Sequence, residues 1–391
     1  MKLRKTLSLF AALLLCPVFC FGCGETPKVP EQGGNPPAIK PDDDVHKPAP
    51  VPAVSVLTFD KSLNEEYVNW YGRVRADGVK TDFSNSSAGF EVSFTGTSLT
   101  ATIISAESSY PNEAAGNAYA YVFLDGVTNY KRAKEIQFNS TEQETEYVLA
   151  ENLNEGKHTV KLLKRTEAKY GTAALVKLET DGGFETPPEK PSLKFEIIGD
   201  SIMSGSESMR SNVSETNVTE SENTLASYGY VAASEFRAQV NCITRSGALV
   251  SGYNGYASIP QYYDSYSQID VSTWDFSRYQ PDVILLDLGT NDRLIGAPSE
   301  LIAEKYVEFV RHLREKNPAA AIFCCEGAML DSLKTIVSNA VKTLNQEGDG
   351  RVWYYHLPNL RIAGGHPTES DHRENGYALA DFIRETLELS F

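Results

Sequence analysis

The chain carries a serine that could act as a nucleophile. Ser201 comes directly after the apolar segment 194–198, in the sequence Gly199-Asp200-Ser201. A serine that ends a buried strand and starts a tight turn into a helix exposes its hydroxyl, and backbone amides there point toward the group that it attacks. These three residues alone are more typical of a serine that caps a helix, so the interpretation depends on partners elsewhere in the chain.

Two further segments carry groups that could stabilise a negatively charged oxygen. Residues 289–292 read Gly-Thr-Asn-Asp after the apolar segment 283–288, and the side-chain amide of Asn291 can donate a hydrogen bond to a developing oxyanion. Gly247 follows the apolar segment 240–244, where a backbone N–H could point to the same place. Each segment alone is also typical of an ordinary turn.

A serine nucleophile needs a base, and the chain has six histidines. Four are set aside by position, because they fall in a proline-rich segment, in the β-rich part, on the polar face of a predicted helix and after a predicted strand: His46, His158, His312 and His356. His356 is excluded on the weakest grounds. His366 and His372 remain, in the loop 364–372 before the last predicted helix. One of them could reach Ser201 across the top of a sheet.

The elements that must position these residues follow two different periods. From about residue 54 to residue 185, short segments such as 89–94, 118–124 and 158–163 alternate apolar and polar residues and are separated by turns. This pattern predicts an all-β sandwich, most typical of a jelly roll. A short proline-rich hinge, residues 186–191, follows it.

From residue 192 to residue 391 apolar strands alternate with amphipathic helices. The predicted strands are 194–198, 240–244, 283–288, 321–325 and 352–355, and the predicted helices are 226–236, 301–316, 333–344 and 373–389. This alternation predicts an α/β domain with a parallel five-stranded sheet flanked by helices. Ligands of such sheets bind at the carboxyl ends of the strands, where Ser201, Gly247 and Asn291 would lie.

The first residues indicate export. Residues 1–22 combine a basic start with an apolar stretch too short to span a bilayer, which predicts a signal peptide. Gly22 before Cys23 resembles a bacterial lipobox, so we expect lipidation at Cys23 and anchoring at the cell envelope or cell surface. The alternative is an ordinary secretory signal cleaved near Gly22. Residues 23–53 contain eight prolines and should form an extended tether.

Charge and cysteine usage exclude several partners. The chain has 36 Lys and Arg against 52 Asp and Glu, a net charge of −16. This acidity argues against nucleic acid and against docking on anionic lipid, so contact with a membrane is expected only through the lipid anchor. Three cysteines outside the N-terminal segment, Cys242, Cys324 and Cys325, lack the spacing of a metal or redox site and are expected to be buried, inert thiols.

The motifs occur in the order of a known family. Four segments resemble the four blocks of SGNH (GDSL-type) hydrolases: residues 199–201, Gly247, residues 289–292 and His366 with Pro367. Segments 227–229, 274–276 and 279–282, together with His372, look like the family 2 carbohydrate esterases. That family pairs a jelly roll with an SGNH domain, and the resemblance covers essentially everything from about residue 54 onward.

The resemblance implies a role for each matching residue. Ser201 matches the nucleophile and His366 the general base, while the amides of Ser201 and Gly247 and the side chain of Asn291 match the oxyanion hole. No metal or cofactor is implied. A triad acid normally stands three residues before the histidine, where this chain has Ala363. We therefore expect a Ser–His dyad, with Glu369–His372 as the rival acid–base pair.

The expected function is that of a secreted esterase that removes O-acetyl groups from plant polysaccharides, xylan, glucomannan or their oligosaccharides, through an acetyl-enzyme intermediate. Alternatives are an SGNH esterase acting on lipid or on acetylated cell-wall glycan, and a glycan-binding protein with a vestigial hydrolase domain. Trp274 is singled out as a substrate-binding aromatic residue. The polar segment 206–223 is interpreted as a solvated surface loop or as a rim of the site.

Overall fold

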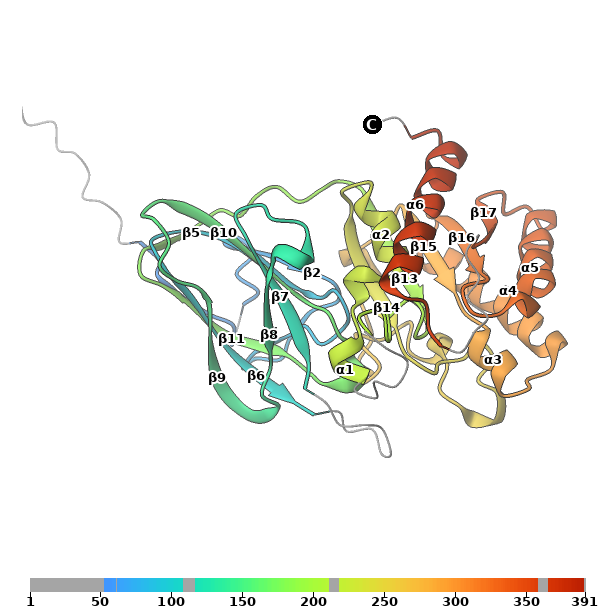
Figure 1. The fold of residues 1–391 in the computed structure, drawn as a ribbon, viewed down its shortest axis with the longest axis horizontal. Helices are drawn as coiled ribbons and strands as arrows, with labels where there is room; N and C mark the ends of the chain where they lie inside the picture. The colour runs from blue at the N-terminus through green and yellow to red at the C-terminus, as the bar shows by residue number, and fades with distance from the viewer. Residues whose placement is uncertain (1–52, 61, 108–116, 211–217, 358–364, 390–391) are drawn as a thin grey trace, which may run out of the picture. The chain divides into compact units, whose positions relative to one another are not determined.

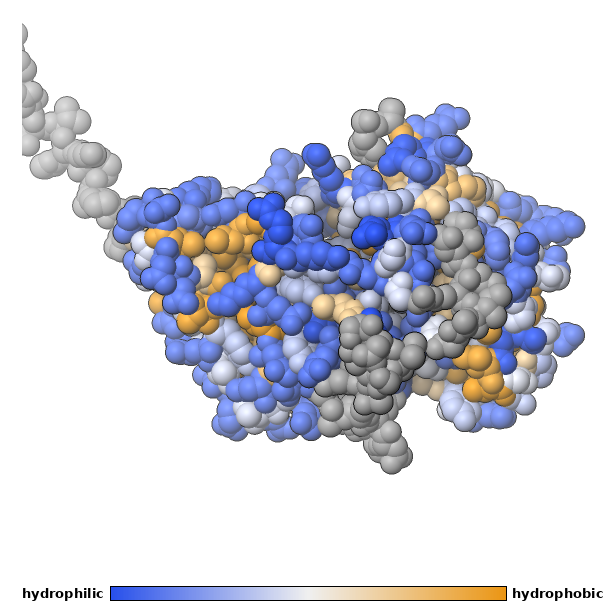
Figure 2. Space-filling model, in the orientation of Figure 1, coloured by the Kyte–Doolittle hydropathy of each residue, from blue (hydrophilic) through white to orange (hydrophobic). Residues whose placement is uncertain are grey.

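The computed structural model describes residues 53–60, 62–107, 117–210, 218–357 and 365–389, and residues 52–391 form one compact unit (Figure 1). The predicted signal peptide, Cys23, most of the tether and Ala363 lie outside the described residues. Within the described part, no helix is both long enough and apolar enough to cross a membrane. The face of the molecule in Figure 2 is mostly hydrophilic, with hydrophobic residues in separate areas.

The first part of the unit is a sandwich of two antiparallel sheets, as predicted. One sheet has the order β3-β4-β11-β6-β9, with β1 on β11, and the other has the order β12-β5-β10-β7-β8, with β2 on β5. The strands of the first sheet are β1 (Val56–Thr58), β3 (Arg75–Ala76), β4 (Thr81–Asp82), β6 (Leu99–Ala106), β9 (Thr141–Ala150) and β11 (Ala174–Thr180). Those of the second are β2 (Val68–Tyr71), β5 (Gly89–Thr95), β7 (Tyr119–Leu124), β8 (Lys134–Gln137), β10 (Lys157–Lys164) and β12 (Gly183–Glu185).

Alternating side chains of these strands form the core between the two sheets. Phe90, Val92 and Phe94 of β5 are fully buried, and they pack with Leu99, Ala101 and Ile103 of β6 from the other sheet. Large aromatic side chains such as Phe83 and Phe138 fill the rest of this core and meet edge to face. The period-two pattern of the sequence therefore reflects one buried face on each sheet.

The second part is the predicted α/β domain. Its five strands are parallel in the order β14-β13-β15-β16-β17. They are β13 (Lys194–Gly199), β14 (Gln239–Thr244), β15 (Val283–Asp287), β16 (Ala321–Glu326) and β17 (Val352–His356). The helices are α1 (Val218–Ser221), α2 (Tyr228–Ser234), α3 (Thr290–Leu294), α4 (Ser299–Lys316), α5 (Lys334–Gln346) and α6 (Glu369–Thr386).

Helix pairs cover both faces of this sheet (Figure 1). Helices α4 and α5 pack their apolar stripes on one face, against side chains such as Ile284 and Ile322. Helices α2 and α6 pack together and cover the other face, against Leu285 and Phe323. Consecutive residues of one strand thus enter opposite cores, which explains why the strands read as continuous apolar runs.

Capping residues explain where two helices begin later or earlier than the sequence predicts. Helix α2 begins at Tyr228 because the side chain of Ser227 caps it, while Thr224–Ala226 form a separate 3-10 turn. Helix α6 begins at Glu369, four residues before the predicted start, because Thr368 and Asp371 form a capping box. This cap fixes the direction of the chain just after His366.

Buried arginines join the sandwich to the α/β domain. Arg73 is 1% exposed, and its Nη2 lies 3.3 Å from Glu196 Oε1 of β13 while Nη1 donates to the carbonyl of Ser265 at 2.6 Å. Arg165, also 1% exposed, follows β10 and donates to backbone carbonyls of residues 219–222. The sandwich is therefore fixed to the edges of the α/β domain by desolvated, hydrogen-bonded charges.

Candidate active site

Ser201 stands on a tight turn at the carboxyl end of β13. The turn is closed by hydrogen bonds from Ser204 N to the Asp200 carbonyl and from Ser206 N to the Ser201 carbonyl, both 3.0 Å. Residues 201–209 form successive turns in place of the expected regular helix. A Cβ at Gly199 would lie 2.8 Å from the Asp287 carbonyl, so only glycine fits where the strand enters this turn.

His366 reaches the serine from the loop before α6. Its Nε2 lies 2.7 Å from Ser201 Oγ, within the distance required for proton transfer from the hydroxyl. The backbone holds the two segments together, because Glu369 N donates to the Ser208 carbonyl at 3.0 Å. The pair expected from the sequence is therefore brought into contact.

A carboxylate that the sequence analysis missed occupies the other side of the imidazole. Glu207 Oε2 lies 3.1 Å from His366 Nδ1, and the other carboxylate oxygen pairs with Arg210. The hydrogen bond to the imidazole of His366 is the main cause that lowers the pKa of Glu207 below its usual range, against the effect of partial burial. The expected dyad thus has a third group, supplied six residues after the serine instead of three before the histidine.

The backbone at Glu207 is strained. Its φ is 60°, in the left-handed region that a residue with a long side chain rarely adopts. Such a conformation persists only where the surrounding structure enforces it, and it is common at functional sites. In sequence, the only available signal was a lone glutamate in a polar segment.

Two backbone N–H groups beside Ser201 Oγ are free to bind an oxyanion. In the described part of the chain, neither Ser201 N–H nor Gly247 N–H has an acceptor. Gly247 has a φ of 78°, in the left-handed region that favours glycine. A Cβ there would meet no other atom, so the backbone conformation, and not a lack of space, explains the glycine. These are the backbone donors that the sequence analysis expected.

Asn291 lies in the same cavity, but its amide is engaged. Nδ2 donates to Asp200 Oδ2 at 3.0 Å and to the Ala248 carbonyl at 3.1 Å, so both of its hydrogens have acceptors. Asp200 is fully buried, and burial is the main reason why the pKa of its carboxyl is raised well above the usual value. Asn291 must release one of these acceptors before it can donate to an oxyanion.

These residues line one cavity of about 260 Å³. Ser201, Gly247, Asn291, His366 and Glu207 are joined there by Tyr170, Ser206, Ser246, Thr290, Leu294 and Met329. Tyr170 comes from the sandwich, in a 3-10 turn (Ala168–Tyr170) after β10. The sandwich therefore supplies part of the wall, which sequence spacing did not indicate.

The sandwich also supports the cavity from below through Glu167. Its Oε2 accepts the N–H of Ser246 at 2.8 Å, next to Gly247, and Lys169 Nζ donates to the Ser246 carbonyl at 3.3 Å. The Glu167 N–H donates to Glu222 at 2.5 Å, and Ser206 Oγ donates to the same carboxyl. The residue before Gly247 is therefore held by a side chain from the other domain.

This layer beneath the cavity is fully buried. Glu167 and Glu222 are each 0% exposed, and burial raises the pKa of both carboxyls. Burial also lowers the pKa of the neighbouring Lys164 to about 7. Most described residues of segment 206–223 are buried, although Met209 and Glu220 are exposed, and Ser206 and Glu207 line the cavity; the segment therefore fits the alternative interpretation, a rim of the site, better than a solvated surface loop. Residues 211–217 lie outside the described part.

Several candidates from the sequence lie elsewhere. Glu369 and His372 do not pair, because the Glu369 carboxylate binds Tyr130 and Lys131 of the sandwich, and His372 is buried with Nδ1 accepting the Tyr228 N–H at 3.2 Å. His356 binds Glu326 at 2.7 Å.

Trp274, expected to bind substrate, does not line the catalytic cavity. It is 4% exposed, meets Tyr266 edge to face and packs against the guanidiniums of Arg73 and Arg278, near the opposite end of the sheet. The loop that carries it runs back toward the amino ends of the strands before β15 begins. The three cysteines of the body are buried and free, as expected. Among the described residues, no cluster of three or more His, Cys, Asp or Glu could hold a metal ion.

Comparison with known families agrees with this architecture. Residues 70–188 match the carbohydrate esterase 2 N-terminal domain, and residues 197–384 match the GDSL-like lipase/acylhydrolase family. The two matches together span more than half of the chain. The chain pairs a carbohydrate esterase 2 N-terminal domain with a GDSL-like hydrolase domain, which supports a carboxylic ester hydrolase.

Curated relatives and a solved structure are consistent with this. The chain is 29% identical over 319 residues to an acetylxylan esterase/glucomannan deacetylase of Cellvibrio japonicus, covering 78% of this chain and 87% of that protein. It is 28% identical over 327 residues to the cellulase/esterase CelE of Acetivibrio thermocellus, covering 80% of this chain but only 38% of the length of CelE. A family two carbohydrate esterase from Clostridium thermocellum, solved with cellohexaose, superposes with a TM-score of 0.74 at 26% identity, over 82% of this esterase and 99% of that chain.

Proposed function

We propose that this esterase removes O-acetyl groups from plant polysaccharides, xylan, glucomannan or their oligosaccharides. The observation that carries the proposal is the 2.7 Å contact between Ser201 Oγ and His366 Nε2 beside two free backbone N–H groups. The acetylxylan esterase/glucomannan deacetylase of Cellvibrio japonicus supports the substrate class.

The reaction follows from the geometry in two halves. Ser201 Oγ attacks the carbonyl carbon of the acetyl ester while His366 Nε2 takes its proton, and the N–H groups of Ser201 and Gly247 hold the oxyanion. The tetrahedral intermediate collapses, His366 protonates the departing sugar oxygen, and an acetyl ester on Ser201 remains. Water, deprotonated by His366, then attacks this ester; acetate leaves and the proton returns to Ser201.

Glu207 completes this machinery as a positioning residue. By accepting a hydrogen bond from Nδ1–H, its carboxylate selects the tautomer whose Nε2 can take the proton of Ser201. Its negative charge also stabilises the imidazolium that forms in each half-reaction. The arrangement is then a Ser201–His366 pair oriented by Glu207, in place of an unsupported dyad.

The dimensions of the cavity favour a small acyl group. Its volume is about 260 Å³, and Leu294 at its edge is 61% exposed, so the sugar side of the ester is open to solvent. A long acyl chain would find only the buried ring of Tyr170, the half-buried Met329 and the exposed Leu294 as large apolar side chains here. An acetyl group on an extended glycan fits such a shallow, open site.

Acetate release from several polymers tests this function. We expect release from acetylated xylan or acetylated glucomannan, and a decrease of roughly 10⁴-fold or more in Ser201→Ala, because the nucleophile is removed. Release from an acetylated cell-wall glycan alone, or hydrolysis of long acyl esters only, would contradict the plant-polysaccharide proposal. A fully active Ser201→Ala variant would contradict the mechanism.

We also propose that the esterase is exported and lipid-anchored through Cys23, since a basic start, a short apolar stretch and Gly22 precede that cysteine. Mass spectrometry of the mature N-terminus tests this proposal. An unmodified Cys23, or a later first residue, would contradict the lipid anchor.

A further inference from the structure

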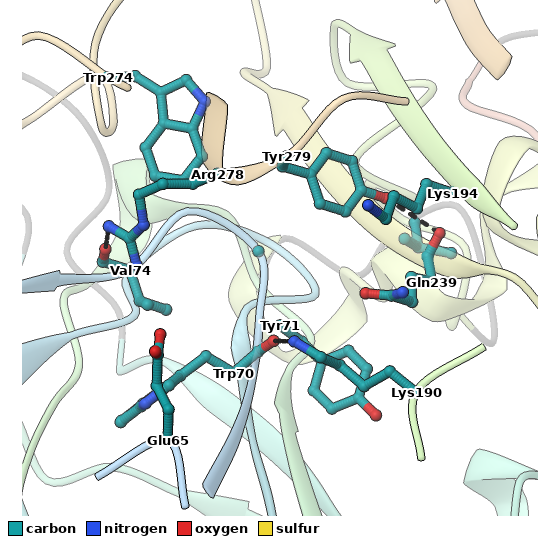
Figure 3. A pocket seen from close by; sticks show the side chains of 12 residues that line it. Glu65, Trp70, Tyr71, Val74, Lys190, Lys194, Gln239, Trp274, Arg278 and Tyr279 are labelled. Atoms are coloured by element: carbon teal, nitrogen blue, oxygen red, sulfur yellow. Dashed lines mark hydrogen bonds between the residues drawn. The ribbon is translucent and has the colours of Figure 1, made fainter. Parts of the chain in front are cut away.

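A second cavity lies at the opposite end of the parallel sheet. It has a volume of about 300 Å³ and is bordered by the amino ends of β13 and β14, at Lys194 and Gln239, and by β2 of the sandwich. Lys190 of the proline-rich hinge, together with Trp274, Arg278 and Tyr279 from the loop before β15, completes the lining (Figure 3). Since β13 spans six residues, this cavity lies roughly 20 Å from Ser201.

Three cations converge on this cavity without carboxylate partners. Within the described part of the chain, no carboxylate pairs with the side-chain nitrogens of Lys190, Lys194 or Arg278 within 4.0 Å, although the backbone N–H of Lys194 donates to Asp282. Lys190 Nζ makes only a long 3.4 Å contact with the Trp70 carbonyl, and Arg278 donates to the Val74 carbonyl at 3.0 Å (Figure 3). Most other cations where the sandwich meets the α/β domain are paired with carboxylates, as Arg75 is with Asp270.

The three cations act on one another. Burial lowers the pKa of Lys190, and the charges of Lys194 and Arg278 lower it further. Glu65, which also lines the cavity, and the more distant Glu91 act in the opposite direction, but Glu91 already accepts a hydrogen bond from Tyr71 at 2.7 Å. A bound anion would reduce the electrostatic repulsion among these three cations, which form a local positive cluster in a protein of net charge −16.

Aromatic rings provide the rest of the lining. The buried rings of Trp70, Tyr71 and Trp274 and the ring of Tyr279 border the cavity, and the single hydroxyl hydrogen of Tyr279 is directed between the carbonyl oxygens of Phe195 and Gln239, at 2.8 and 3.1 Å. Flat rings with a few fixed polar groups suit a sugar ring, which has apolar faces and a polar edge. The volume is at the small end of ligand pockets and suits a single monosaccharide unit.

We propose that this cavity binds a hexuronate, a sugar unit that carries a carboxylate, as a side group of the glycan. The ring lies against the aromatic side chains, and the carboxylate is held by Lys190 and Lys194, with Arg278 beside it. This site goes beyond the proposed deacetylation, since it binds part of the polymer away from Ser201. Its test reads binding alone and does not depend on esterase activity.

Intrinsic fluorescence tests the proposal directly, because two of the three tryptophans of the chain line the cavity. The third, Trp353, stacks on Phe323 in the α/β core and serves as a constant background. We expect D-glucuronate, titrated at constant ionic strength, to cause a saturable change. D-Glucose, which lacks the carboxylate, and inorganic phosphate, which lacks the ring, should each bind at least about tenfold more weakly.

Two double variants identify the binding residues. We expect Lys190→Gln/Lys194→Gln to weaken glucuronate binding at least about tenfold, because both charge-assisted contacts are lost. The matched control, Lys334→Gln/Lys342→Gln, removes two exposed lysines of α5 and should bind as the unchanged protein does. Thermal unfolding of both variants confirms that each is folded.

Four results would overturn the proposal. Equal responses to D-glucuronate and D-glucose would show that the cations take no part. Phosphate binding as tight as glucuronate binding would show a simple anion site. An unchanged response in the folded Lys190→Gln/Lys194→Gln variant, or no response at all in the unchanged protein, would show that the cavity is not the site.

Discussion

Glutamate and histidine occur both in the catalytic cavity, facing solvent, and in the buried structure around it. The two regions use these residue types differently. In the cavity, the side chains of His366 and Glu207 are 23% and 19% exposed and pair with each other, and the pKa of Glu207 is lowered. Away from solvent, Glu167 beneath Ser246 and His372 in α6 are each 0% exposed, and burial raises the pKa of the glutamate and lowers that of the histidine to about 3. Partial exposure leaves the imidazole and its carboxylate partner accessible for proton transfer, whereas burial favours neutral groups that hold the backbone.

The largest effect should separate the two histidines of these layers. We expect His366→Ala to lower kcat/KM roughly 10⁴-fold or more, because the base for both half-reactions is lost. His372→Ala should keep most of the activity of the folded protein but lower the free energy of unfolding by about 2–4 kcal/mol, since a buried ring that accepts the Tyr228 N–H is removed. Hydrolysis of a chromogenic acetate ester and urea unfolding measure the two quantities.

The reverse pattern would contradict this division. If only His372→Ala abolished turnover while remaining folded, the buried histidine would be the base, and the contact of His366 with Ser201 would be incidental.

A smaller effect is expected within the exposed layer. Glu207→Gln should lower kcat roughly 10–100-fold with little change in KM, because the neutral amide orients His366 but no longer stabilises the imidazolium. Steady-state kinetics on the same acetate ester measure kcat and KM separately. The exposed Glu300→Gln of α4 serves as a control. A change in KM alone would indicate that Glu207 contacts the substrate and does not act through His366.

The smallest effect concerns the buried layer and its dependence on pH. His372 has a pKa of about 3 in the folded protein against a usual 6.5, so between these values the unfolded chain binds a proton that the folded chain does not. Folding stability therefore decreases as the pH falls below about 6.5, by roughly 2 kcal/mol at about pH 5. His372→Asn keeps an acceptor for the Tyr228 N–H without this titration, and should lose about 2 kcal/mol less than the unchanged protein.

Urea unfolding at about pH 7.5 and about pH 5 checks this difference. Equal losses in the two proteins would show that His372 becomes protonated within the folded state, and that the contrast between the layers is smaller than burial implies.

The fold and half of the site could be predicted from local pattern. Each β-strand of the α/β domain was expected within one or two residues, because its burial on both faces leaves a continuous apolar run. Ser201, Gly247 and His366 were found because each follows a strand or precedes a helix, so topology alone brings them to one edge.

The remaining residues depend on contacts that no local pattern encodes. Glu207 meets His366 across a large sequence separation, through a left-handed backbone that only the folded turn enforces. Tyr170 and Glu167 belong to the sandwich, and their approach to Gly247 depends on how the domains pack. Trp274 was misplaced because a loop in sequence beside the oxyanion segment can run to either end of the sheet.

Arg73 and Arg165, the buried arginines that join the sandwich to the α/β domain, make the two domains depend on each other. Removing the sandwich at the hinge, residues 186–191, would remove Arg73 and leave the Glu196 carboxylate of β13 without its cation. It would also remove Glu167 from beneath Ser246. The sandwich thus acts as a permanent built-in subunit, and a recombination that moves one domain must move the other with it.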